Sequence, residues 1–121
     1  MVVDEAVLLR TVGDASVMAE QFDHLAEVAR SSDIRVRPLD ASPHIAILSP
    51  FTIFVPRESD IDPTVVNVES GYHDAYWYEA AEVRRFTQAF DELAASALSP
   101  SESAAMILAA ASQQHQAVTR Q

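Results

Sequence analysis

The sequence has 121 residues, of which 49% are hydrophobic, and this suffices for one domain with a compact core. It contains no cysteine, which excludes disulfides, thiolate nucleophiles and thiolate zinc sites. The formal net charge of −10 argues against direct nucleic-acid binding, because acidic side chains repel a phosphate backbone.

The first third of the chain predicts a strand, a helix and a second strand. Met1–Asp4 is an apolar strand candidate, and Val7–Leu9 continues the apolar stretch. Asp14 is a good N-cap for a helix over Ala15–Arg30, whose apolar residues recur at three- and four-residue steps. Ile34–Leu39 alternates apolar and polar residues, as a half-buried strand does.

Two further strands are predicted in the middle of the chain. His44–Leu48 is a short apolar segment, and Phe51–Val55 is a β-rich run closed by a proline. Thr64–Glu69 contains three valines and has the pattern of a buried strand. Gly71 follows it, and we expect this glycine to adopt a positive φ in a turn.

The last third predicts two helices. From about Glu79 the apolar period changes to 3.6 residues, with a stripe formed by Val83, Phe86, Phe90, Leu93 and Ala97. Ser99–Glu102 is a capping box with proline at the first helical position, and its helix continues to about His115. This order predicts a single α+β domain over residues 1–121, with three helices packed on a small, mainly antiparallel sheet.

All three tyrosines and the only tryptophan lie within residues 72–78. A ligand pocket needs apolar walls and a few aimed polar groups, and these rings with a neighbouring acid meet that description. We therefore predict a small-molecule pocket whose ligand-binding residues are Tyr72, Asp74, Tyr76, Trp77, Tyr78 and Phe51. The alternative is a corner where bulky rings plug the end of a sheet.

If the protein is an enzyme, its catalytic candidates are Glu69, His73 and His44. Glu69 closes a strand just before the aromatic rings, so we expect it to be partly desolvated, as a general base often is. The alternative for Glu69 is a surface acid or a salt-bridge partner of Arg84 or Arg85.

Metal binding and nucleophilic hydrolysis have little support. A metal site would have to combine His44, Glu69, His73 and Asp74, which lack the spacing of known zinc motifs. Adjacent side chains on extended backbone also point in opposite directions. The chain has no GxSxG elbow. We therefore expect no metal and no other cofactor.

Several stretches along nearly the whole chain resemble one bacterial domain; they read VVDEAVL, VMAEQFDHLAEVA, IRVRPL, PHIAILSPFTIF, VVNVE and EVRRFTQAFDELAASALSPSESAAMI. The domain is the C-terminal, antitoxin-like part of Xre-type helix-turn-helix transcriptional regulators. In those regulators a DNA-binding domain and a helical lead-in come first, and this chain starts at the family's first strand. After Val68–Glu69 such relatives carry small and aliphatic residues, where this chain has Gly71-Tyr72-His73-Asp74.

The resemblance implies a ligand-sensing or dimerising regulatory domain that acts through a partner and does not itself bind DNA. Without the lead-in, an apolar surface should remain uncovered, so we expect a homodimer. The alternative is a small acid–base enzyme, such as a cyclase, isomerase or hydrolase, acting on an apolar small molecule in the same pocket. No apolar run has the length of a membrane span and no signal peptide is visible, so we expect a cytoplasmic protein without membrane contact.

Overall fold

The computed structural model describes residues 1–44, 49–58 and 61–121; of the predicted segment His44–Leu48, only His44 lies within the described residues. The chain divides into two compact units. Unit 1 comprises Met1–Ala41 and Ser96–Gln121, and unit 2 comprises Ser42–Ala95. The predicted α+β class is confirmed, although the strands form two sheets instead of one.

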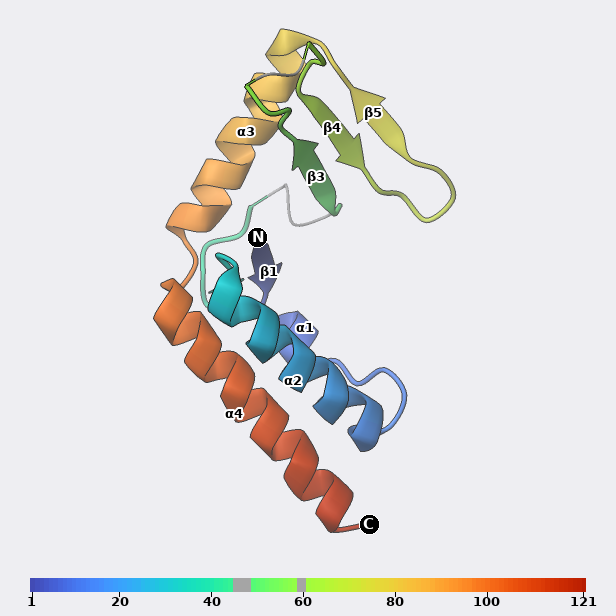
Figure 1. Ribbon diagram of the computed structural model, residues 1–121, viewed down its shortest axis with the longest axis vertical. Coiled ribbons are helices and arrows are strands. Elements are labelled where there is room, and N and C mark those ends of the chain that lie inside the picture. The colour runs from blue at the N-terminus through green and yellow to red at the C-terminus, as the bar shows by residue number, and fades with distance from the viewer. Residues whose placement is uncertain (45–48, 59–60) are drawn as a thin grey trace. The chain divides into compact units, whose positions relative to one another are not determined.

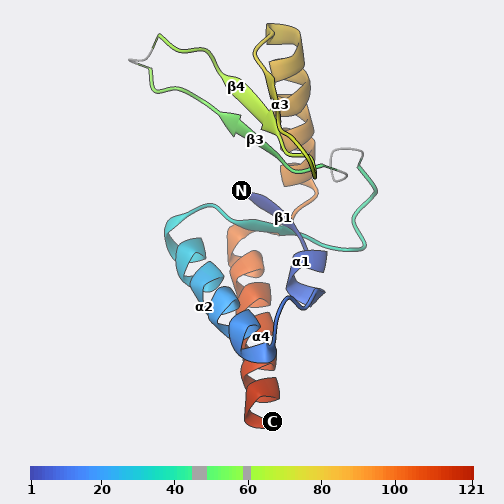
Figure 2. The ribbon, with the colours of Figure 1, turned by 90° about the vertical axis from the view of Figure 1, so that its right-hand side faces the viewer.

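Unit 1 is a parallel strand pair covered by helices. Its elements are β1 (Val2–Asp4), α1 (Ala6–Leu9), α2 (Ala15–Ser31), β2 (Arg35–Arg37) and α4 (Pro100–Thr119). β1 pairs with β2 in parallel, and α2 and α4 lie side by side in opposite directions (Figures 1 and 2). The short helix α1 falls on the apolar stretch for which no helix was predicted.

Local capping chemistry fixes where the two long helices of unit 1 begin. The Asp14 side chain accepts a hydrogen bond from the Val17 amide at 3.0 Å, as predicted. The capping box is also confirmed, because Ser99 and Glu102 each bond the other's backbone amide. Gly13 precedes the first cap with φ +79°, a conformation that glycine adopts without steric cost.

The core of unit 1 lies between the helices and the strand pair. It buries the side chains of Leu8, Met18, Phe22, Ala26, Ile34, Val36, Ile107 and Ala111. The outer edge of β2 is closed by the chain leading into α4, since Leu98 donates its amide to the Val36 carbonyl at 2.8 Å. The fully buried Ser103 hydroxyl accepts the Val36 amide, also at 2.8 Å.

Unit 2 is a three-stranded antiparallel sheet with one helix. Its elements are β3 (Phe51–Phe54), β4 (Val65–Val68), β5 (Ala75–Trp77) and α3 (Ala80–Ala95), with β4 in the centre of the sheet (Figure 1). The Thr64–Glu69 and Phe51–Val55 strand predictions are confirmed, whereas β5 was not predicted. Of the eleven buried hydrophobic residues in the described ranges only two belong to unit 2, so few apolar side chains are buried in the described part of this unit.

The unit 2 sheet has one face toward α3 and one face away from it. The Phe51 ring contacts the Phe86 ring of α3 at a centroid distance of 5.3 Å. Because paired residues of antiparallel strands share a face and faces alternate along each strand, Trp77 lies on this same face. The other face, which we call the open face, carries Thr52, Phe54, Val65, Asn67 and Tyr76.

Candidate functional site

The aromatic segment does not form the predicted hollow. Tyr72 is 99% exposed, and Glu69 and its neighbours up to Asp74 are also exposed. The expectation that Glu69 is desolvated among the rings is therefore wrong. Glu69 is a surface acid, and Arg85 instead lies 3.3 Å from Glu82, one turn earlier in α3.

His73 belongs to a tight turn after β4. The Ser70 hydroxyl donates to the His73 carbonyl and accepts the His73 amide, which closes the turn. Gly71 sits in this turn without a positive φ, so the conformation expected of it was wrong. A hydroxyl-closed turn needs no left-handed residue, because the serine side chain replaces a backbone partner.

The remaining predicted ligand residues are divided between the two faces of the sheet. Phe51 and Trp77 lie on the face toward α3, and Tyr76 lies on the open face. Tyr76 and Tyr78 are 56% and 57% exposed. These residues therefore line no common cavity in the described chain, and their binding of a ligand stays a prediction.

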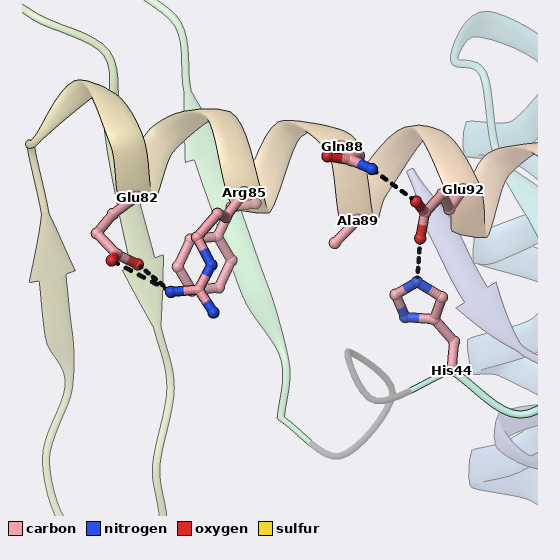
Figure 3. A pocket seen from close by; sticks show the side chains of 7 residues that line it. His44, Glu82, Arg85, Gln88, Ala89 and Glu92 are labelled. Carbon is pink, nitrogen blue, oxygen red and sulfur yellow. Dashed lines mark hydrogen bonds and ion pairs between the residues drawn. The ribbon is translucent and has the colours of Figure 1, made fainter.

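A shallow groove of about 430 Å³ lies along α3 instead (Figure 3). The described residues that line it are His44, Glu82, Arg85, Phe86, Gln88, Ala89 and Glu92. Only His44 among them was a predicted site residue. The others recur on one face of α3 at steps of three and four, and that spacing is the sequence signal that could have identified them.

The groove is closed at one end by a histidine–glutamate pair. The imidazole Nε2 of His44 lies 2.6 Å from Oε2 of Glu92, whose other oxygen accepts from Gln88 at 3.0 Å (Figure 3). The hydrogen bond from His44, followed by that from Gln88, lowers the pKa of Glu92 below its usual range. The Glu92 side chain is half exposed, so this pair contributes only modestly to holding His44 against α3.

The described chain has no candidate metal centre and no single helix suited to a membrane. Residues 1–44, 49–58 and 61–121 contain no group of three or more histidine or acidic side chains able to hold a metal ion. Within the same ranges no single helix is long and apolar enough to cross a membrane, and only α3 and α4 taken together pass that test, by length and composition.

These features define a small α+β protein with a shallow groove along α3 and exposed apolar side chains. Residues 1–109 match the model of DUF5753, a domain of unknown function, and the chain belongs to this family. Comparisons with curated proteins and with solved structures find no match.

Proposed function

We propose that this protein is a regulatory domain of the kind found at the C-terminus of Xre-type helix-turn-helix regulators, and that it works by self-association. It senses a ligand or dimerises in transcriptional control, acts through a partner in the cytoplasm, and does not bind DNA itself. The net charge of −10 supports the last point, because a chain so acidic repels nucleic acid.

The observation that carries the proposal is an uncovered aliphatic surface on unit 1. Val7, Leu9, Val12 and Val17 are 52%, 63%, 67% and 53% exposed, and they lie on α1, the following loop and the start of α2. We call these four residues the α1 surface. Exposed apolar side chains are common singly, and we infer that these four, which are close together in the chain, contribute to one interaction site.

A second copy of the chain suits the α1 surface. Its only charged neighbours in residues 7–17 are Arg10 and Asp14, one of each sign. Among the described residues Arg10 makes no ion pair, and Asp14 caps α2 with one carboxylate oxygen. A twofold contact brings the same patch of both copies together, so Arg10 of one copy can face Asp14 of the other.

Light scattering over a micromolar to millimolar range tests the proposal. We expect wild type to shift from monomer to dimer mass with rising concentration. Leu9→Ser should weaken dimerisation by about tenfold or more, because a twofold contact loses the apolar side chain twice.

The matched control is Ile61→Ser, which removes an aliphatic side chain that is fully exposed in unit 2. It should leave the dimerisation constant unchanged. A monomer at every concentration, or a dimer that is equally sensitive to both substitutions, contradicts self-association through the α1 surface.

An acid–base enzyme is the second candidate, and the His44–Glu92 pair favours it. A carboxylate that orients an imidazole beside an apolar groove is an arrangement that proton-transfer enzymes use. His44→Gln should return the pKa of Glu92 toward its usual value, as followed by carbon NMR titration of the carboxyl group. An unchanged Glu92 titration would show that the pair does not form, and this candidate would then lose its only support.

A further inference from the structure

Side chains of different chemistry form successive rows across the open face of the unit 2 sheet. The register places Thr52, Asn67 and Tyr76 in one polar row across all three strands. Phe54 pairs with Val65 to give an apolar row beside it. Phe54 and Tyr76 are 57% and 56% exposed, so both rows offer large side chains to a partner.

An acidic row lies on the opposite side of the polar row. The Glu69 amide donates to the Pro50 carbonyl at 3.0 Å, which carries the β3–β4 ladder one residue past β4. Continuing the β4–β5 register by one residue places Asp74 opposite Glu69, on the same face. The distance along the strand from Glu69 to Val65 is four residues, or about 14 Å.

Asn67 lies at the centre of this face. The residue is only 7% exposed, and its Nδ2 atom is buried without a hydrogen-bond partner in the part of the chain that the structure describes. An unpaired buried amide is unfavourable, so the site favours an acceptor supplied from outside. A rotation of the exposed Tyr76 side chain, a fast motion at a surface, would give that acceptor access.

The charge of unit 2 indicates the chemistry of the partner. Residues 42–95 contain nine acidic residues and three arginines. Two of these arginines, Arg84 and Arg85, belong to α3, which covers the other face. A flat sheet face suits a polypeptide better than a small molecule, because small-molecule sites are concave. A basic partner therefore complements this face.

We propose that the open face binds a basic, extended segment of another protein. An arginine lies at the acidic row, a carbonyl oxygen accepts from Asn67, and an apolar side chain packs on Phe54. An extended peptide covers about 14 Å in four residues, so the arginine and the apolar residue are four positions apart. This surface belongs to unit 2 and shares no residue with the α1 surface of unit 1, so different substitutions test the two proposals.

Amide NMR of the full chain with blocked glycine–serine peptides tests the inference. The probes carry one arginine and one tryptophan separated by two, four or six positions. We expect saturable shifts at residues 52–54, 65–69 and 74–78, with the tightest binding at a separation of four. Replacing arginine by the uncharged citrulline should remove most of the binding, as should high salt.

Two substitutions that each remove one negative charge identify the face. Glu69→Gln should weaken binding by about twofold to fivefold, whereas Asp91→Asn on the exposed side of α3 should not.

Three results overturn the inference. They are equal binding of the citrulline peptide, shifts confined to α3, and the absence of saturable shifts with every peptide. Concentration-dependent shifts of the open face without peptide would also overturn it, because they would assign this face to a second copy of the chain. Dimerisation through the α1 surface is distinguished by shifts in residues 6–17.

Discussion

Removing the Ser103 hydroxyl should destabilise unit 1 out of proportion to the size of the change. This hydroxyl is fully buried and accepts the Val36 amide at 2.8 Å, which gives the edge strand β2 a partner on its outer side. Ser103→Ala leaves a buried backbone amide without a partner. Such a loss costs about 1–3 kcal/mol in the free energy of unfolding.

Ser112→Ala is the matched control, because it makes the same change in the same helix at an exposed position. The Ser112 hydroxyl donates a hydrogen bond to the Leu108 carbonyl, one turn earlier in the same helix. Alanine has the higher helix propensity at both positions, so the difference between the two variants isolates the bond to Val36. We expect Ser112→Ala to remain within about 0.5 kcal/mol of wild type.

Urea unfolding followed by far-UV circular dichroism measures both variants, and most of that signal comes from helices. The fluorescence of Trp77, the only tryptophan, reports on unit 2 in the same samples. We expect Ser103→Ala to lower the dichroism midpoint clearly below that of Ser112→Ala. Equal midpoints for the two variants would refute the reasoning that Ser103 holds the edge of β2.

Two further predictions concern α4. Ile107→Ala should lower the free energy of unfolding in urea by about 2–5 kcal/mol, because Ile107 is fully buried. Leu108→Ala, at a half-exposed position, should lower it by less than about 1 kcal/mol. Equal losses would contradict the packing described for unit 1. The capping bonds of Ser99 lower the pKa of Glu102, so this carboxylate contributes stability above its ordinary pKa that is lost as the pH falls through the lowered value. Glu102→Gln should flatten the acid limb of a stability–pH profile, and an unchanged limb would show that the Glu102 charge contributes nothing to stability.

The helices could be predicted because their signals are local. The Asp14 cap and the capping box at Ser99 each lie within four residues of the groups that they satisfy. The 3.6-residue period then fixed which side of each helix is buried. The ends were less certain, since α4 continues to Thr119, beyond the predicted end at about His115.

The sheets depended on contacts that no local pattern contains. The parallel pairing of β1 with β2 joins residues more than thirty positions apart, and the Val36–Ser103 bond spans 67 positions. Neither a single strand pattern nor composition specifies such a partner. For that reason one antiparallel sheet was expected where the chain forms two.

The site was harder to predict than the fold. The cluster of rings and acids at residues 69–78 was predicted to converge on one pocket, but alternation along β5 sends neighbouring rings to opposite faces. His44 was identified without its partner Glu92, because the two residues are 48 positions apart. Closeness in sequence does not make side chains converge, because consecutive residues of a strand point to opposite faces.

Hydrogen exchange at two protein concentrations tests the central proposal, self-association through the α1 surface, most directly. We predict that amides in residues 6–17 exchange more slowly in the concentrated sample than in the dilute one, and that Leu9→Ser removes the difference. Identical exchange of this stretch at both concentrations would contradict the proposal.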